Sequence, residues 1–185
     1  MGYEAINFCN CLKTPPTMSI LEIEVYPAPI LKQKAAPVEN IDDRLRQLAE
    51  DMLETMYKAP GVGLAAPQVG ELLRLIVADS GESEKPDPIV LINPQIITGE
   101  GSASIKEGCL SVPGFTAEVE RYQKIVVRAW TLEEKEIEIE ACDFPAIIFQ
   151  HELDHLDGVL FIDRISRLKR NIYERKLKKG TLNRD

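Results

Sequence analysis

The sequence lacks the features of several large protein classes. Its four cysteines (Cys9, Cys11, Cys109 and Cys142) are too few and too scattered for a disulfide scaffold, which favours a reducing compartment. No apolar run approaches the ~20 residues that cross a membrane as a helix. Residues 1–17 have no basic start and no sustained apolar core, so no secretory signal is predicted there. These absences argue against a secreted disulfide-rich protein and a helical membrane protein.

Length and composition favour one globular domain. A chain of 185 residues can bury one hydrophobic core but hardly two. Its hydrophobic fraction of 44% and charged fraction of 28% are those of a soluble folded protein. We therefore expect a single domain over residues 18–185 and a flexible leader over residues 1–17. That leader would be an upstream start or a cloning remnant.

Charge is unevenly distributed along the chain. The total is −8, yet residues 164–185 hold nine lysines and arginines against two acidic residues, a local charge of +7. Residues 1–163 therefore carry −15. An acidic body does not suit general binding to nucleic acid, whereas a basic tail suits a local contact with RNA.

Histidine is scarce, and both copies fall in one motif. His151 and His155 frame the sequence His-Glu-x-x-His within residues 150–158. Residues four apart lie on one face of an α-helix, so both imidazoles can bind the same divalent metal ion. Glu152 lies about 100° around the helix from His151, where it can reach a water on that ion without binding the ion itself. The alternative is a pair of ordinary helix histidines.

The third metal ligand distinguishes the protein classes that share this motif. The metzincin pattern requires a histidine where this chain has Phe161, so that class is excluded. A thermolysin-like protease uses a downstream glutamate, and Glu174 is the only one after the motif. Glu174 lies among lysines and arginines, where a surface ion pair is expected. Cys109 is the better candidate, with a small buried thiol as its ordinary alternative.

Hydrophobic periodicity predicts a mixture of helices and strands. Residues 40–58 have one apolar helical face, with Asn40 or Asp42 as the cap and Pro60-Gly61 as the stop. Strands are predicted over 19–25, 72–78, 89–97, 119–120, 124–130 and 136–140, with an exposed loop over 79–88. The last three strands alternate apolar and polar residues, as half-buried antiparallel strands do.

Two more helices are predicted towards the end of the chain. Asp143 is the expected N-cap of the helix that carries the histidine motif, with Pro145 in its first turn. Ile147 and Ile148 come one turn before the motif and are expected to line the wall beside the metal. Residues 164–180 are predicted to form a basic amphipathic C-terminal helix. Its apolar positions are Ile165, Leu168, Ile172 and Leu177.

Residues 61–68 (GVGLAAPQ) combine small side chains with two glycines. Such a segment can pass close to a ligand or to another part of the backbone. A phosphate-binding loop is not predicted, because no Lys-Ser/Thr pair follows. Gln68 offers an amide donor that can point into a site. A tight packing loop is the alternative.

Three segments of the chain occur in this order: GVGLAAPQ (61–68), EGCLS (107–111) and QHELDHLDG (150–158). This triple resembles the peptide deformylase family, whose patterns are G-x-G-x-A-A-x-Q, E-G-C-x-S and Q-H-E-x-D-H. Every fixed position matches, and the C-terminal helix is similar to that of the bacterial type 1 branch. The resemblance implies an α+β fold, in which antiparallel β-sheets surround a central metal-binding helix, with further helices near the N-terminus and at the C-terminus.

By this resemblance, Cys109, His151 and His155 bind one divalent metal ion, and water or hydroxide fills the open fourth position. The family's physiological metal is usually Fe²⁺, with Zn²⁺, Ni²⁺ or Co²⁺ able to occupy the same site. Thiolate and imidazole ligands suit several of these ions. The implied reaction removes the formyl group from the initiator N-formylmethionine of nascent polypeptides and releases formate.

The resemblance also implies roles around the metal. Glu152 would act as general base and then as general acid. The side-chain amide of Gln68 and the backbone N–H of Leu110 would donate hydrogen bonds to the developing oxyanion. An apolar slot for methionine and a backbone contact to the peptide are expected from Val62, Gly63, Leu110, Phe144, Ile147 and Ile148. Some relatives have an arginine where this chain has Thr116, so contacts beyond the first substrate residue are left open.

Two other functions compete with this interpretation. One is a zinc endopeptidase that uses Glu174 as its third ligand. The other is a ribosome-associated binding module with a structural metal, although such sites are normally closed by four protein ligands. The expected partners are N-formyl-methionyl nascent peptides and, through the basic C-terminal helix, the ribosome, with a solvated helix face as the alternative. We expect a cytoplasmic monomer with no membrane contact.

Overall fold

The structure is a computed structural model that describes residues 19–81 and 85–179. The predicted leader over residues 1–17 lies outside this range. Among the described residues, no helix is long and apolar enough to cross a membrane.

The described chain holds three α-helices and seven strands, with three short 3₁₀ turns. The helices are α1 (Asp43–Lys58), α2 (Asp143–Leu156) and α3 (Arg167–Lys178). The strands are β1 (Gly63–Ala65), β2 (Leu75–Ala78), β3 (Ile89–Glu100), β4 (Ala103–Cys109), β5 (Val112–Arg121), β6 (Lys124–Trp130) and β7 (Glu136–Cys142). The 3₁₀ turns are η1 (Pro29–Lys32), η2 (Ala66–Val69) and η3 (Phe161–Asp163).

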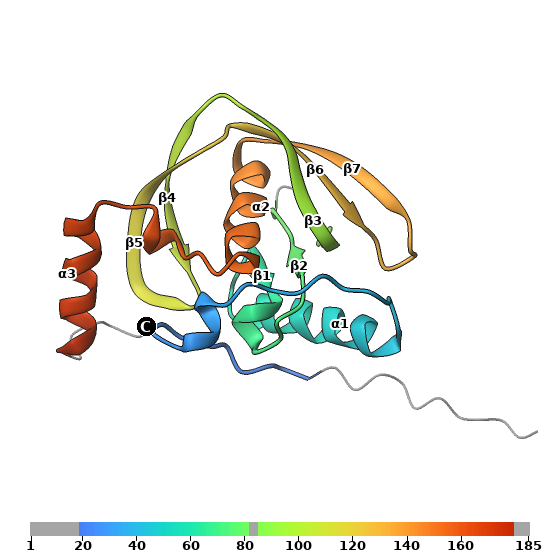
Figure 1. The fold of residues 1–185 in the computed structure, drawn as a ribbon, viewed down its shortest axis with the longest axis horizontal. Coiled ribbons are helices and arrows are strands. Elements are labelled where there is room, and N and C mark those ends of the chain that lie inside the picture. The colour runs from blue at the N-terminus through green and yellow to red at the C-terminus, as the bar shows by residue number, and fades with distance from the viewer. Residues whose placement is uncertain (1–18, 82–84, 180–185) are drawn as a thin grey trace, which may run out of the picture.

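Two antiparallel sheets enclose the central helix α2 (Figure 1). The larger sheet has the order β1-β2-β3-β6-β7, and β4 pairs only with β5. Every residue of α2 from Ala146 to Leu156 is buried. This arrangement confirms the predicted α+β fold with antiparallel sheets around a central helix.

Helix α1 forms as its sequence predicts. The Asp42 side chain caps it by accepting a hydrogen bond from the Leu45 N–H at 2.9 Å. Its apolar positions occur every three or four residues, so they share one face and pack beneath β1 and β2. The buried apolar residues of this face are Leu45, Ala49, Met52 and Met56.

Strand β4 was not predicted. Its sequence ASIKEGC lacks a clean apolar alternation, because one inward position is the charged Glu107. β3 also runs three residues past its predicted end and turns into β4 at Gly101, whose φ of +68° suits glycine. A charged residue on a buried face conceals the period-2 pattern on which strand prediction depends.

The strand predicted over residues 19–25 is wrong. That segment joins no sheet among the described residues, and its amides bind two different elements. Ser19 and Leu21 donate to Asp51 and Thr55 of α1, and Glu24 donates to a carbonyl of η2. No single neighbouring strand is available along its length, so a ladder does not form.

The predicted cap of α2 is displaced by one residue. The N-cap is Cys142, and its side chain makes no capping hydrogen bond. Asp143 has a φ of +52°, and its carboxylate accepts from the Gln123 amide at 3.0 Å instead of from a helix N–H. The carboxylate thus ties α2 to the turn before β6.

The predicted apolar face of α3 is only partly correct. Leu168 and Ile172 are 71% and 45% exposed, whereas Tyr173 is completely buried. Tyr173 lies 4.8 Å from Phe115 and 6.0 Å from Tyr26, measured between ring centroids. Because an aromatic ring holds α3 against the body, Leu168 and Ile172 remain at the surface.

We expect Tyr173→Ala to lower the free energy of unfolding by about 3–5 kcal/mol, since it removes a fully buried ring. Tyr173→Phe is the matched control. It keeps the ring and deletes a hydroxyl that has no hydrogen-bond partner among the described residues, so stability should be equal or higher. Urea denaturation of both variants tests this. Equal midpoints for the two variants would show that α3 is not anchored by this ring.

Candidate metal centre

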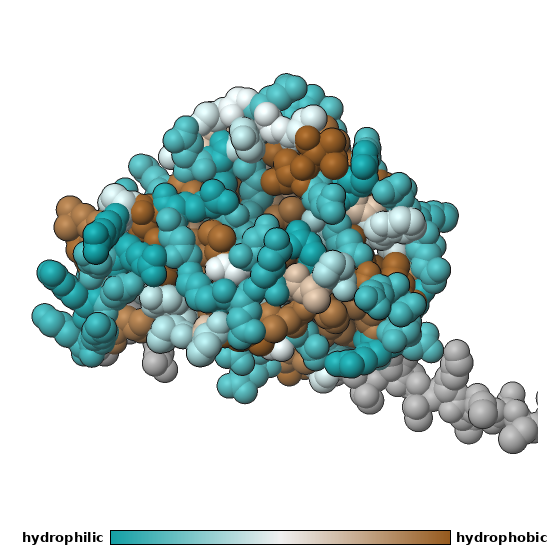
Figure 2. Space-filling view, viewed as in Figure 1, coloured by the Kyte–Doolittle hydropathy of each residue, from teal (hydrophilic) through white to brown (hydrophobic). Residues whose placement is uncertain are grey.

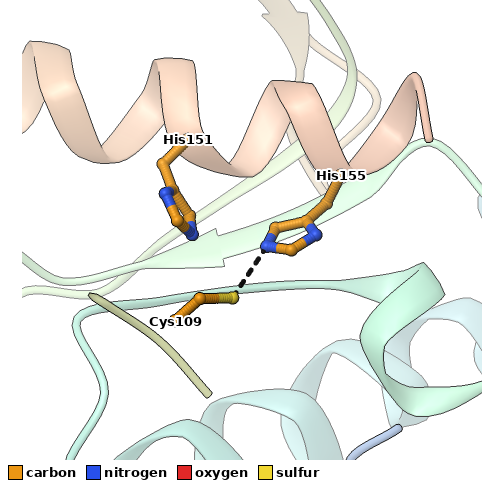
Figure 3. A group of neighbouring side chains, drawn as sticks. All are labelled: Cys109, His151 and His155. Atoms are coloured by element: carbon orange, nitrogen blue, oxygen red, sulfur yellow. Dashed lines mark hydrogen bonds between the residues drawn. The ribbon is translucent and has the colours of Figure 1, made fainter. Parts of the chain in front are cut away.

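Three possible metal ligands converge between α2 and the end of β4 (Figure 3). The ligand atoms of Cys109, His151 and His155 all lie within 4.8 Å of one another. The Cys109 Sγ is 3.2 Å from the His155 Nε2. The structure therefore brings together the three residues that the sequence singled out.

Local backbone structure explains this convergence. His151 and His155 are one turn apart on α2, so both rings project towards β4. The register of β4 against β5 shifts between Glu107 and Cys109, and Cys109 then pairs with Val112 across the hairpin turn. This irregularity ends the strand and leaves Cys109 partly buried beside the helix.

A buried carboxylate orients His151. Glu107 accepts a hydrogen bond from His151 Nδ1 at 2.7 Å, which leaves Nε2 for a metal. Burial disfavours the charged carboxylate. The hydrogen bonds from His151 and Arg121 outweigh burial and lower the pKa of Glu107 to about 2. Glu107 is therefore a carboxylate at neutral pH and accepts the hydrogen bond from the His151 Nδ1–H group.

Arg121 connects this carboxylate to helix α2. Its guanidinium donates to Glu107 at 2.7 and 3.0 Å and to Asp154 at 2.6 Å. Arg164 donates to Asp154 from the surface side. Two acids and two arginines thus form one charge-balanced chain behind His151.

Sequence reasoning missed Glu107, Arg121 and Asp154 as parts of the site. Two of them stand inside the matched motifs, Glu107 two residues before Cys109 and Asp154 one residue before His155. Their inward direction follows from strand and helix geometry, but pairing them requires the β4–β5 register. Arg121 stands outside the motifs, so nothing in the sequence identified it.

The two histidines have opposite protonation tendencies. Burial favours neutral His151, but contacts with Cys109 and Glu107 outweigh it and raise its pKa well above the usual value. For His155, burial and the neighbouring His151 both lower the pKa. His155 therefore presents a neutral ring, which is the form that binds metals.

Glu152 is buried beside the three ligands. Burial raises the pKa of Glu152 to about 7, so its carboxyl group can both accept and donate a proton near neutral pH. Its Oε2 atom has no hydrogen-bond partner among the described residues. A Cβ atom on Gly63 would lie 2.4 Å from the Glu152 Oε1. Glycine at position 63 therefore makes room for this carboxylate.

Gln68 is fixed by three contacts within the site. Its Oε1 accepts from the Ala65 N–H at 2.8 Å, so its Nε2 must face the opposite way. That Nε2 donates to the Ser111 hydroxyl at 3.1 Å and lies 3.6 Å from the Cys109 Sγ. The amide N–H₂ group is thus held beside the Cys109 thiol.

A cavity of about 630 Å³ opens onto these residues. The predicted pocket residues Val62, Gly63, Leu110, Phe144, Ile147 and Ile148 all line it, together with Gln68, Cys109, His151 and Glu152. A larger cavity of about 870 Å³ borders another face of α2. Ion pairs such as Arg74–Asp157 line that second cavity, and none of the three possible ligands does. The smaller cavity is therefore the candidate binding site.

Glu174 lies outside this centre. It accepts hydrogen bonds from the Tyr26 hydroxyl at 3.2 Å and from Arg170 at 3.1 Å on α3. It does not join the group of three ligand atoms found among the described residues. The arrangement that an endopeptidase would need with Glu174 as third ligand is therefore absent from the described residues.

We expect Glu107→Gln to weaken divalent-ion binding by about 10- to 100-fold, because His151 would lose the carboxylate that orients it. Competition with a chromogenic chelator measures the affinity. Glu118→Gln, on the outer face of the same hairpin, is the matched control and should bind the ion normally. Equal affinities in the two variants would contradict this role of Glu107.

Comparisons with known proteins identify the family. The family model described as "Polypeptide deformylase" matches residues 20–171. A peptide deformylase of Syntrophobacter fumaroxidans is 53% identical over 163 residues, covering 88% of this chain and 96% of the relative. The crystal structure of a peptide deformylase from Legionella pneumophila superposes with a TM-score of 0.82 at 44% identity, covering 88% and 95% of the two chains. One from Ehrlichia chaffeensis in complex with actinonin gives 0.82 at 37% identity, covering 88% and 98%. The chain belongs to the polypeptide deformylase family.

Proposed function

We propose that this centre removes the formyl group from N-formylmethionine at the start of nascent polypeptides and releases formate. The observation that carries the proposal is the meeting of three metal-binding side chains, Glu152 and one open cavity in a member of this family.

We assign Cys109, His151 and His155 as the metal ligands. The donor set fits, since one thiolate and two imidazoles suit Fe²⁺, Zn²⁺, Ni²⁺ or Co²⁺, and we propose Fe²⁺ as the physiological ion. When bound, such an ion makes water a competent nucleophile near neutral pH and polarises a carbonyl oxygen. The ligand group found among the described residues has three members, which suits a catalytic site more than a closed structural one.

Glu152 moves the proton in this proposal. Its pKa of about 7 lets the carboxylate accept a proton from the attacking water and then donate it to the leaving amine. Its burial keeps bulk water from competing for that proton. Formate and a free amino terminus leave the site.

Gln68 and Leu110 are proposed to stabilise the developing negative charge. The Gln68 Nε2 donor is held in place before the reaction, since Oε1 is fixed by the Ala65 N–H. The Leu110 backbone N–H lies next to Cys109 in the hairpin turn that borders the cavity. One donor of this kind typically contributes a factor of about 10²–10³ to the rate.

The methionine side chain is proposed to enter an apolar slot in the cavity. Ile147 and Ile148 form its buried wall, whereas Val62 and Phe144 are 41% and 38% exposed at its rim. Both β1 and β4 are edge strands of their sheets, and Gly63 of β1 lies in the cavity wall. An extended peptide can therefore form backbone hydrogen bonds along these edges.

We propose that the chain works in the cytoplasm as a monomer, with residues 18–185 as one catalytic domain. Nascent polypeptides are made there, and the few cysteines suit a reducing compartment.

A contact with the ribosome is proposed for α3. Its outward side chains include Arg167, Lys169 and Arg175, which are exposed and have no ion pair within the described chain. Figure 2 shows a mostly hydrophilic surface over α3 with a hydrophobic patch at its upper end. Basic side chains beside exposed Leu168 and Ile172 suit docking on ribosomal RNA and protein near the emerging chain.

We expect protein loaded anaerobically with iron to release formate from formyl-Met-Ala-Ser, and Glu152→Gln to lower kcat by at least ~10² while the ion stays bound. Cys109→Ala should lose both the ion and the activity. Measuring formate and bound metal separates the two roles. Full turnover by Glu152→Gln would refute the proton-transfer role. Full turnover by Cys109→Ala would refute the ligand set.

We expect serine at Arg167, Lys169 and Arg175 to reduce co-sedimentation with ribosomes several-fold and to make it less sensitive to salt. Arg170 is left intact, because it holds Asp163 and Glu174. Replacement of Lys58 and Lys135 with serine is the control, because both side chains are exposed and both residues are distant from α3 in the sequence. Unchanged co-sedimentation of the α3 variant would show that this face does not dock.

A further inference from the structure

The β4–β5 hairpin has two chemically different faces. On one face, Ile105, Glu107, Ala117, Val119 and Arg121 point towards α2 and the core. On the other, Ser104, Lys106, Thr116 and Glu118 are exposed. A Cβ atom at Gly108 would contact the Thr116 methyl group at 3.4 Å, which places position 108 on the outer face as well. Residues of a strand alternate between these faces with a period of two.

A substrate peptide bound along the free edge of β4 would alternate in the same way. Strand β4 (Figure 1) ends at Cys109, one of the three proposed metal ligands. A peptide that leaves this end antiparallel to β4 therefore passes Gly108 and then Lys106. Its first side chain, methionine, must turn inward to the apolar slot beside Ile147. The second side chain then turns outward. Because Gly108 has no side chain, Lys106 is the first outer-face side chain that this residue meets.

Lys106 is electrostatically distinctive in the cavity. It is the only lysine or arginine among the described residues that line it. No carboxylate of the described chain forms an ion pair with Lys106. Glu118 pairs with Lys106 across the β4–β5 hairpin, and its negative charge weakens the electrostatic field of the lysine. The charge of −15 on residues 1–163 would repel an acidic peptide at long range. At physiological salt the Debye length is about 8 Å, so the nearby lysine dominates.

We propose that Lys106 is a specificity-determining residue that favours an acidic side chain immediately after N-formylmethionine. The inference rests on the proposed deformylase function and adds a substrate preference to it. Both interacting charges are exposed, so the effect should be modest. We expect the kcat/KM ratio of a peptide with Glu after N-formylmethionine to one with Lys to change roughly two- to fivefold for each unit of charge changed at position 106.

The test uses formyl-Met-Xaa-Ala amides in which Xaa is Glu, Gln or Lys. The terminal amide removes a carboxylate that Lys106 would also attract. The kcat/KM ratio of the Glu peptide to the Lys peptide is measured for each enzyme, so changes in overall activity cancel. Lys106→Glu should lower that ratio by about fourfold or more, and Lys106→Gln by about the square root of that factor. Raising the salt concentration should shrink the wild-type preference.

Lys135→Glu is the matched control, because Lys135 is exposed, lies in the β6–β7 turn outside the cavity and gives the same change in net charge. Its ratio should equal that of the wild type. An unchanged ratio in both Lys106 variants would overturn the proposal, as would an equal shift in Lys135→Glu, which would indicate long-range charge. Either result would leave deformylation intact. Failure of the proposed function would instead appear as no formate from any peptide with the wild-type chain.

Discussion

The hydrogen-bonded ion pairs of Arg121 with Glu107 and Asp154 connect the hairpin that carries Cys109 to the helix that carries the two histidines. Cys109 lies at the end of a two-stranded hairpin that belongs to neither edge of the main sheet, and an isolated hairpin is barely stable in water. Arg121 fastens that hairpin to α2 through Asp154, while Glu107 reaches His151. The thiol is thereby held opposite the two imidazoles.

The ion pairs of Arg121 orient the side chains around them, but burying these charged groups costs desolvation free energy. Arg121, Glu107 and Asp154 are all buried, and a buried ion pair seldom adds net stability over apolar packing. It does fix geometry, because each carboxylate oxygen has a defined donor. The same burial raises the pKa of Glu152 to about 7, whereas direct hydrogen bonds lower that of Glu107 to about 2. Two glutamates at one site thus differ in proton affinity because their surroundings differ.

Sequence alone predicted the local features of this centre and missed its supports. The spacing of His151 and His155 predicted that both rings share one helix face, and Cys109 was already the preferred third candidate before the family motifs were compared. The structure brings the three side chains together. The chain through Arg121 depends on strand register, which no local pattern specifies. The buried charge of Glu107 also concealed β4, and Tyr173 rather than Leu168 or Ile172 anchors α3. Prediction failed where a residue's environment is set by segments distant in the sequence.

The central claim is that one sulfur and two ring nitrogens bind a single cation and leave a position open. X-ray absorption spectroscopy of the zinc-loaded protein tests it most directly, since Zn–S and Zn–N distances of about 2.3 and 2.0–2.1 Å are resolved from each other. The account predicts one ion per chain with one sulfur, two imidazole nitrogens and one exchangeable oxygen, and loss of the sulfur scatterer in Cys109→Ala. A site without sulfur, or one closed by a fourth side chain, would contradict it.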